Sequence, residues 1–220
     1  MQPYFFSLVT KGNIENIKEF LSFNKDFDVN IKDETGRTAL FTAHDLETIK
    51  YLMKNGADIK CYDHENFLPM AYYCEDHQHD IVKFFIENGS DINTKFDHEC
   101  NTALMYASSK GDIEMVKFLF SSPSGQKINV NAKNIDNETA LFNVSDLEIV
   151  KILIANGIDI DVVNSQGKTA LDCAISNKHD KIVEYIKSKE KSCLTIISEN
   201  KETKTVTISI KEGYALVIKN

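Results

Sequence analysis

The stretch from Asn101 to Phe120, with the sequence NTALMYASSKGDIEMVKFLF, decides the fold of this chain. Thr102 suits the capping position of a short helix, whose apolar residues begin at Leu104 and recur at helical spacing. Gly111 interrupts that pattern, and a second apolar pattern of the same period starts at Ile113. The stretch therefore predicts two short antiparallel helices, neither of which can bury its apolar face alone.

Copies of this unit recur along the chain at a nearly regular step. The equivalents of Thr102 are Thr38, Leu68, Thr139 and Thr169, so the successive steps are 30, 34, 37 and 30 residues. A second apolar pattern of helical spacing follows each of these positions, and several of the patterns end in Asn-Gly. Helix pairs of this kind bury a continuous core only when neighbouring copies stack, which is how a solenoid is built.

The order of the recurring motifs resembles that of the ankyrin repeat, a unit of about 33 residues. A polar turn such as Asp33 to Gly36 is followed by Thr-Ala-Leu, by a Leu-Glu-x-Val-like segment and by Asn-Gly-x-Asp-Ile, each with variants. The resemblance covers roughly residues 3–190. It implies a mostly α fold, an ankyrin-repeat solenoid of stacked helix pairs with β-finger turns, and we expect a short antiparallel β tail after it.

The repeat boundaries are set by the polar turns. We expect an ankyrin-repeat domain over residues 1–190 and a C-terminal, β-hairpin-like tail over residues 191–220. Six repeats are expected, at about residues 3–32, 33–62, 63–96, 97–133, 134–163 and 164–190. The second and fifth repeats lack three residues of the pattern before Leu46 and Leu147, so we expect a clipped first helix in both.

The tail is predicted from its alternation of apolar and polar residues. Val206, Ile208 and Ile210 fall on one side of an extended chain, and breaks near Asn200 and Gly213 separate two or three short strands. One interpretation is a cap over the apolar end of the sixth repeat. The alternative is an exposed edge that adds a strand to a partner, or that mediates self-association through residues 191–220 and makes the protein mainly structural.

Composition and charge narrow the function. The formal net charge of −8 and the absence of a basic stripe argue against nucleic-acid binding. Five cysteines lie far apart without a Cys-x-x-Cys pair, which favours a reducing compartment. No signal peptide or membrane span is indicated. We therefore expect a cytoplasmic protein with neither a nucleic-acid nor a membrane partner.

The third repeat departs furthest from the pattern. Leu68 replaces the capping threonine, and Tyr72, Tyr73 and Cys74 replace small residues. Just beyond them, Cys74, His77 and His79 are of the residue types that bind a soft divalent metal. They fall, however, in the polar turn between two helices and lack a fourth ligand at recognisable spacing. The sequence therefore favours solvated histidines and assigns no metal site.

Catalytic motifs are absent from the sequence. It contains no nucleophile elbow, no phosphate-binding glycine loop and no His-Glu-x-x-His motif, so we expect neither an enzyme nor a cofactor. Cys173 lies near His179, but it occupies an apolar position of a first helix, where packing explains it. Binding of another protein is the function that the resemblance implies.

In ankyrin repeats the polar turn at the start of each repeat, such as Asp33 to Gly36, is called a finger. The finger tips and the outward positions of the first helices line a concave groove. We predict the partner-binding anchor on the third and fourth fingers, because Tyr62, Phe67 and Phe96 place apolar rings where a solvated surface would carry polar groups. The predicted site comprises Tyr62, His64, Glu65, Phe67, Phe96, His98, Glu99 and Asn101. The corresponding positions on the other fingers are Lys32, Glu34, Thr35, Arg37, Lys133, Ile135, Asp136, Glu138, Val163, Ser165, Gln166 and Lys168.

Overall fold

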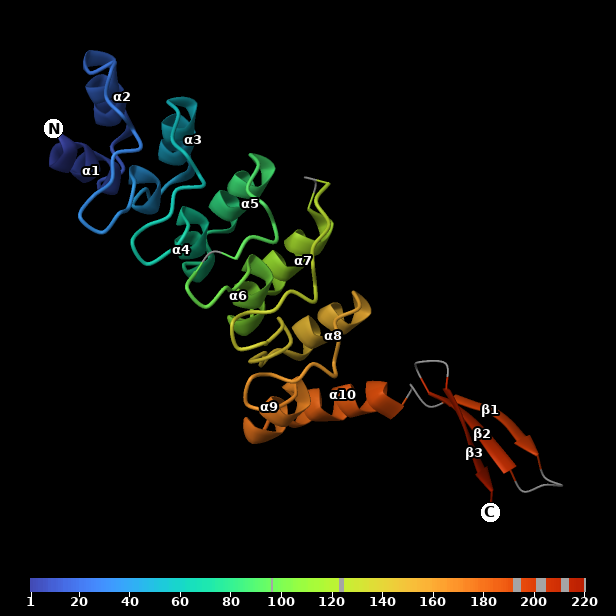
Figure 1. Cartoon of the computed structure of the whole chain (residues 1–220). Coiled ribbons are helices and arrows are strands. Elements are labelled where there is room, and N and C mark those ends of the chain that lie inside the picture. The colour runs from blue at the N-terminus through green and yellow to red at the C-terminus, as the bar shows by residue number, and fades with distance from the viewer. Residues whose placement is uncertain (96, 123–124, 192–194, 201–204, 211–213, 220) are drawn as a thin grey trace.

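The computed structural model describes residues 1–95, 97–122, 125–191, 195–200, 205–210 and 214–219, with the backbone alone for residue 75 and from residue 190 onward. Figure 1 shows helix pairs that follow one another in chain order. The first helices of the pairs are α1 (Gln2–Thr10), α4 (Pro69–Glu75), α6 (Ala103–Ser109) and α9 (Ala170–Ser176), and the second helices are α2 (Ile14–Phe23), α3 (Leu46–Lys54), α5 (His79–Glu87), α7 (Ile113–Ser121), α8 (Leu147–Ala155) and α10 (Asp180–Lys191).

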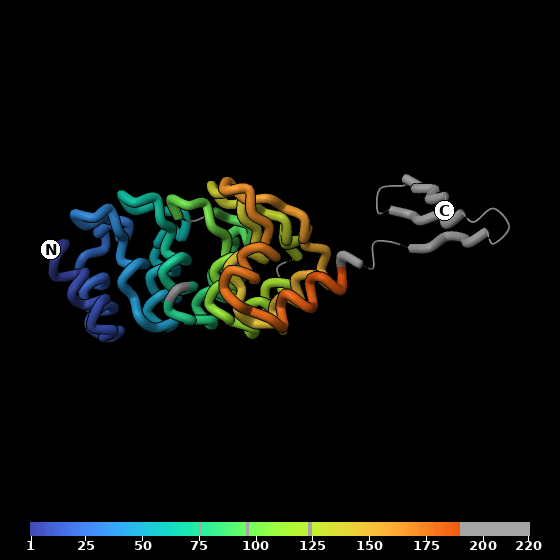
Figure 2. Tube along the Cα trace, turned by 90° about the horizontal axis from the view of Figure 1, so that it is seen from below, coloured from blue at the N-terminus to red at the C-terminus, as the bar shows by residue number. Residues whose placement is uncertain are grey.

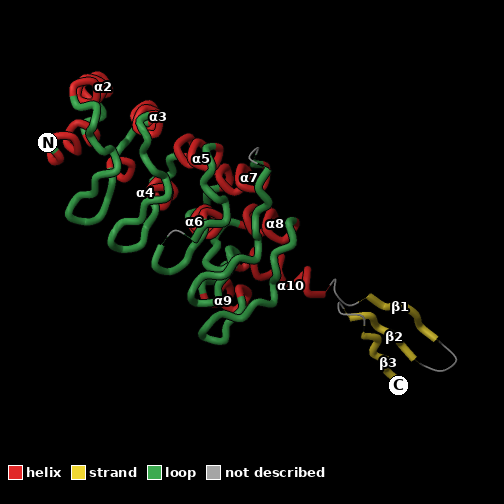
Figure 3. Tube along the Cα trace, turned by 45° about the horizontal axis from the view of Figure 1, so that its top comes forward, coloured by secondary structure: helices red, strands yellow, loops and turns green. Residues whose placement is uncertain are grey.

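The helices are arranged as a solenoid, as the repeats predict. Figure 3 shows the second helices α2, α3, α5, α7 and α8 along one side, whereas the turns between repeats protrude along the other. Figure 2, turned by 90° from Figure 1, shows the same succession of repeats from the N-terminal end to α10. The predicted fold class is therefore confirmed. The six repeat boundaries and the division at residue 190 remain predictions.

The clipped first helices of the second and fifth repeats are confirmed. In the second repeat a three-residue 3-10 helix, η1 (Ala39–Phe41), replaces the α-helix. In the fifth repeat residues 140–143 form turns. One detail of the prediction is wrong: Thr38 occupies the N-cap position of η1, but its buried hydroxyl makes no hydrogen bond to any described residue. In this 3-10 turn the amide at the third helical position, that of Phe41, donates instead to the carbonyl oxygen of Thr38 at 3.0 Å.

Tyr73 compensates for the missing helical turn in the second repeat. Its hydroxyl lies 2.5 Å from the carbonyl oxygen of Leu40 and 2.8 Å from that of Ala43, and it donates its proton to this pair. The Tyr73 side chain is only 3% exposed, so its hydroxyl and these two hydrogen bonds are shielded from water. The large residue that replaces a small one in the third repeat thus satisfies backbone acceptors that the clipped repeat leaves open.

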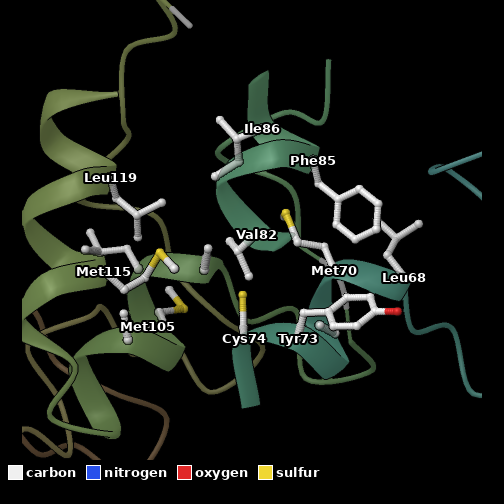
Figure 4. Close-up of a cluster of buried hydrophobic side chains, with 14 of the residues drawn as sticks. Leu68, Met70, Tyr73, Cys74, Val82, Phe85, Ile86, Met105, Met115 and Leu119 are labelled. Carbon is white, nitrogen blue, oxygen red and sulfur yellow. The ribbon is translucent and has the colours of Figure 1, made fainter. Parts of the chain in front are cut away.

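One hydrophobic cluster runs through the whole stack, from Phe5 in the first repeat to Ile186 in the last. Figure 4 shows it at the junction of the third and fourth repeats, where α4, α5, α6 and α7 meet. Met70, Val82 and Met105 point toward one another from three of these helices, and all are buried. Because each such side chain contributes about 1.5–3 kcal/mol when it is buried, the repeats are stabilised by their neighbours.

The Asn-Gly pairs end the second helices, as predicted. Gly56, Gly89 and Gly157 have φ values of 90°, 99° and 82°, in the left-handed region that favours glycine. The amide of the residue after each glycine then donates back into the last turn of the helix, as Ser90 does to the carbonyl oxygen of Phe85 at 3.0 Å. The preceding asparagine side chain adds a second bond of the same kind.

The C-terminal residues form a three-stranded antiparallel sheet of β1 (Thr195–Asn200), β2 (Thr205–Ile210) and β3 (Tyr214–Lys219) in the order β1-β2-β3. Ile208 pairs with Ile196 on one side and with Leu216 on the other. The expected period-two strands are therefore present. Whether the sheet covers the sixth repeat remains a prediction.

Among the described helices, none has both the length and the apolar character of a membrane-spanning segment.

Replacing Tyr73 by phenylalanine tests the proposed compensation. We expect Tyr73→Phe to lower the free energy of unfolding by about 1–3 kcal/mol, because two buried carbonyl groups lose their donor while the ring packing stays. Chemical denaturation measured by circular dichroism checks this, with Tyr4→Phe, at a tyrosine that is 60% exposed, as the control. Equal stability of the two variants would contradict the role of the Tyr73 hydroxyl.

Candidate functional site

Each finger is built around one aspartate or asparagine. The side-chain oxygen of this residue accepts hydrogen bonds from backbone amides two and four residues further along, as Asp63 does from Glu65 and Phe67, both at 2.9 Å. Asp33, Asn134 and Asn164 form the same pair of bonds, and Asp97 accepts the amide of Asn101 at 2.7 Å. Such turns hold the backbone of the finger tip without help from a sheet.

The fourth position of every finger has a left-handed backbone. Glycine occupies it in the second and sixth fingers, as Gly36 and Gly167, but Asn66, Cys100 and Asn137 adopt φ values of 63°, 62° and 61° in the fingers between them. At Gly36 a Cβ atom would lie only 2.8 Å from the amide nitrogen of His64, so this position has no room for a side chain and requires glycine. The sequence pattern identified the glycines but not their substitutes.

Backbone hydrogen bonds join the second finger tip to the third, the fourth to the fifth and the fifth to the sixth. The amide of His64 donates to the carbonyl oxygen of Thr35 at 3.0 Å, and the amide of Ile135 donates to that of Glu99 at 2.9 Å. Ser165 donates in the same way to Asp136 at 2.8 Å. These bonds fix the spacing of side chains that neighbouring fingers present.

Three asparagines at the bases of the fingers clamp one repeat to the next. Asn30 donates to the carbonyl oxygen of Gly56 at 2.8 Å and accepts the amide of Asp58 at 2.7 Å. Asn93 and Asn131 make the equivalent pairs of bonds two and three repeats further along. Sequence reasoning missed them, although the recurring Asp-Val-Asn and Asp-Ile-Asn triplets were a signal that could have found two of them.

The structure places the predicted site residues of the third finger on the outer surface. Tyr62 is 45% exposed, and His64 and Glu65 are exposed as well. Phe67 is half-buried, with its ring centroid 5.7 Å from that of Tyr72 and 5.6 Å from that of His98. The third and fourth fingers are therefore in contact through Phe67 and His98.

The predicted residues of the fourth finger divide into two groups. His98 and Glu99 are exposed, as a binding surface requires. Asn101 is half-buried and serves the finger itself, because its side-chain amide donates to Asp97 and Glu99 at 2.9 and 3.0 Å. Phe96 lies outside the described residues, so its place in the site remains a prediction.

Tyr72 is the centre of a cluster that the sequence did not reveal. Its hydroxyl donates to Asp63 at 3.1 Å and accepts a hydrogen bond from the guanidinium group of Arg37, which also lies over the tyrosine ring. Arg37 Nε donates to the same Asp63 oxygen at 3.3 Å. The phenyl ring of Phe41 packs against Tyr72 on another side. This cluster joins the second finger, the third finger and α4.

The cluster changes the acidity of its members. Burial, followed by the hydrogen bond and the negative charge of Asp63, raises the pKa of Tyr72 to about 12. Burial opposes the charged form of Arg37, but the hydrogen bond to Asp63 and the electrostatic effects of Tyr72, Asp63 and Asp33 together outweigh it, so the pKa of Arg37 is raised above its ordinary value. The chain has a single arginine. Its position next to a finger that contains an aspartate was a sequence signal that could have indicated a charged cluster here.

A hollow of about 240 Å³ lies between the fourth and fifth fingers. Its walls include the carboxylates of Glu99, Asp136 and Glu138 and the apolar side chains of Met105 and Phe142. The hollow faces the segment where the fifth repeat has turns instead of a first helix. Its combination of acidic and apolar walls suits a side chain with an apolar stem and a positive end.

The three candidate metal ligands of the third repeat do not converge as a set. Cys74 is buried, and Figure 4 shows it pointing into the cluster formed by Met70, Val82 and Met105. The alternative that the sequence did not favour, with Cys74 beside the histidines, does not occur, because α4 turns this side chain toward the core. His77 and His79 instead approach Asp112 of the fourth repeat.

A family model of ankyrin repeats (3 copies) matches residues 43–134 and 104–197, which together cover more than half of the chain. This chain belongs to the ankyrin repeat family. Ankyrin repeats are generally protein–protein interaction modules, and they typically act as scaffolds without catalytic activity.

Relatives of the chain come from different sources. The chain is 35% identical over 112 residues to Alpha-latrotoxin-Lg1a of Latrodectus geometricus, covering 50% of this chain and 8% of the toxin. It is 24% identical over 224 residues to ankyrin repeat protein OPG189 of Variola virus, covering 85% of this chain and 40% of the viral protein. The chain thus spans less than half the length of both relatives.

The fold also matches solved structures. An ankyrin repeat domain from Acinetobacter baumannii AYE superposes with a TM-score of 0.72 at 25% sequence identity, and the match covers 86% of this chain and 98% of that domain. This agreement supports the stacking of the repeats.

The Tyr72 cluster predicts a pH dependence. We expect the phenol of Tyr72 to titrate at about 12 rather than at about 10, the ordinary value, in the difference between the absorbance titrations of the wild-type protein and Tyr72→Phe. A raised pKa means that the cluster stabilises the fold below about pH 10 and that this contribution is lost as the pH rises to about 12. The unfolding free energy of the wild type should therefore fall more over this range than that of the variant. A difference curve centred near 10 would contradict the cluster.

Proposed function

We propose that this chain binds a partner protein through the finger tips and concave surface of its second to fifth repeats. The observation that carries the proposal is the row of finger tips, in which backbone bonds join the second finger to the third and the fourth to the fifth, and the rings of Phe67 and His98 join the third to the fourth. On this row Tyr62 and Phe67 offer aromatic surface, and exposed polar side chains surround them. Aromatic anchors with a polar rim are the usual composition of a protein interface.

The fixed backbone supports binding as well as folding. Association loses free energy for every loop or side chain that becomes ordered on binding. Here the Asp63 turn and the Arg37–Tyr72 pair already hold the third finger in place. The backbone of this surface is therefore already ordered before a partner binds. Binding then loses less free energy to ordering, so affinity is higher for the same contacts.

The charge of the surface indicates the chemistry of the partner. Glu65, Glu99, Asp136 and Glu138 lie on the third to fifth fingers, and three of them border the hollow. A partner segment that carries lysine or arginine complements this surface, and one such side chain fits the hollow with its stem against Met105. The remaining acidic residues of the chain reinforce the same preference through long-range attraction.

Truncation of the two aromatic anchors tests the binding surface. We expect Tyr62→Ala and Phe67→Ala each to weaken partner binding about tenfold or more, because interface aromatics account for much of the binding energy. Proteins retained from extracts of the native cell by the immobilised wild-type chain would be identified and then measured against each variant by calorimetry. Tyr4→Ala and Phe23→Ala, at aromatic residues that are 60% and 80% exposed outside the fingers, are the matched controls.

Two results would contradict this surface. One is equal affinity of Tyr62→Ala and the control variants for the same partner. The other is no loss of affinity in Glu99→Gln with Asp136→Asn at low ionic strength, since the proposed charge complementarity would then be absent.

A second candidate function is self-association through the C-terminal sheet. The strand order β1-β2-β3 leaves β1 and β3 each with one neighbouring strand in this sheet, so each offers an edge to another strand. Such an edge can extend a sheet across two copies of the chain or bind a strand of a partner.

Removal of the tail separates the two functions. If the fingers carry the function, a chain that ends at Lys191 should have the same oligomeric state as the full chain in light scattering and should keep its affinity for the partner. A full chain of dimeric or larger mass that becomes monomeric on truncation would favour the sheet instead. The melting temperature of the shortened chain provides the control for folding.

A further inference from the structure

Three side chains that can bind a metal meet at the junction of the third and fourth repeats. His77 and His79 come from the turn between α4 and α5, and Asp112 comes from the equivalent turn between α6 and α7. Nδ1 of His77 lies 3.2 Å from Oδ2 of Asp112, and Nε2 of His79 lies 2.5 Å from the same oxygen. In the described part of the chain the three ligand atoms lie within 4.8 Å of one another.

The two oxygens of Asp112 have separate roles. Oδ1 accepts the amide of Met115 at 3.0 Å and caps α7. Oδ2 is the atom that faces both histidines. The Asp112 side chain is only 7% exposed, so the structure holds a nearly buried carboxylate oxygen in a fixed direction toward two imidazole nitrogens. Capping of α7 accounts for the position of Oδ1, but it does not account for the direction of Oδ2 toward the histidines.

The backbone at His77 is left-handed. Its φ is 55°, and the equivalent turns of the first and fourth repeats have glycine there, with φ values of 64° at Gly12 and 73° at Gly111, whereas the sixth repeat has Lys178 at 60°. A residue with a Cβ atom in this conformation costs roughly 1–2 kcal/mol relative to glycine. The third repeat thus carries an imidazole at a position where the fold itself favours glycine, and the ring is directed to Asp112. Strain of this kind is concentrated at functional sites.

We propose that His77, His79 and Asp112 bind one divalent cation of the zinc class across this repeat junction. The ligands are Nδ1 of His77, Nε2 of His79 and Oδ2 of Asp112. Around a tetrahedral zinc ion, ligand atoms at about 2.0–2.2 Å from the metal are about 3.3 Å apart. The His77 distance already has this value, and the imidazole of His79 has to retreat by less than about 1 Å.

The donor set decides the class of metal. Two imidazole nitrogens and one carboxylate suit zinc and the neighbouring transition metals, whereas magnesium and calcium prefer oxygen ligands alone. Three protein ligands leave a fourth position, and an open hollow of about 470 Å³, whose lining includes His77, His79, His44 and Glu114, adjoins the site. Water therefore has access to the fourth position.

A metal at this point would join two repeats directly. The ligands from residues 77 and 79 belong to the repeat that departs most from the family pattern, and Asp112 belongs to the regular fourth repeat. Binding to the folded chain alone stabilises it in proportion to the logarithm of the metal concentration. The site would therefore strengthen the junction beside the predicted anchor on the third and fourth fingers.

Titration of the full chain with zinc chloride, after removal of bound metal with a chelator, tests the proposal. We expect calorimetry to show one zinc ion per chain. The melting temperature should rise by about 5–10 °C at a free zinc concentration 100 times the Kd, with no rise in magnesium chloride. His64→Ala, which removes an exposed histidine of the third finger, should leave both results unchanged.

Two variants separate metal binding from folding. His77→Gly removes a ligand and relieves the left-handed strain, so its metal-free melting temperature should equal or exceed that of the wild type while zinc binding weakens at least tenfold. Asp112→Asn keeps a side chain that caps helices well but replaces the carboxylate, so zinc binding should weaken to a similar extent. The proposal is overturned if zinc does not bind with this stoichiometry, or if either variant binds zinc as tightly as the wild type.

Discussion

The structure depends on one constraint, which is that no helix pair of this chain can bury its own apolar face. The core lies between copies, and it runs without interruption from Phe5 to Ile186. Each repeat therefore has to bury the apolar surface and pair the polar groups of its neighbour, even where one of the two repeats is shortened. The second repeat shows the result, because its clipped helix leaves carbonyl groups that Tyr73 of the third repeat satisfies.

Polar side chains stabilise the solenoid in addition to the apolar core, because they pair backbone groups within and between repeats. The finger residues Asp33, Asp63 and Asn134 satisfy backbone amides within a turn, and Asn30 and Asn131 satisfy backbone groups of the following repeat. Unpaired backbone groups would be costly at these sites, and the described residues of the fingers form no sheet beyond the isolated bridge between Val163 and Thr169. The same bonds that stabilise the solenoid therefore hold the exposed side chains of the candidate binding surface in position.

The third repeat combines the features that distinguish this chain from a regular stack. Tyr72 turns outward to Arg37 and Asp63, whereas Cys74 turns into the core. His77 and His79 reach Asp112 of the next repeat. Departures from the repeat pattern thus have different consequences within a few residues, since successive positions on a short helix and its turn face different neighbours.

The sequence by itself determined the solenoid, the clipped repeats, the glycine helix stops and the strands of the tail, because each follows from local periodicity or from the backbone freedom of one residue. It also indicated Tyr62, His64 and Glu65 as surface residues of the third finger. Only the tertiary structure decided the Tyr72 cluster, the direction of Cys74 and the approach of the two histidines to Asp112. These depend on residues about 30 positions apart in the sequence, whose distance is set by how one repeat packs on the next.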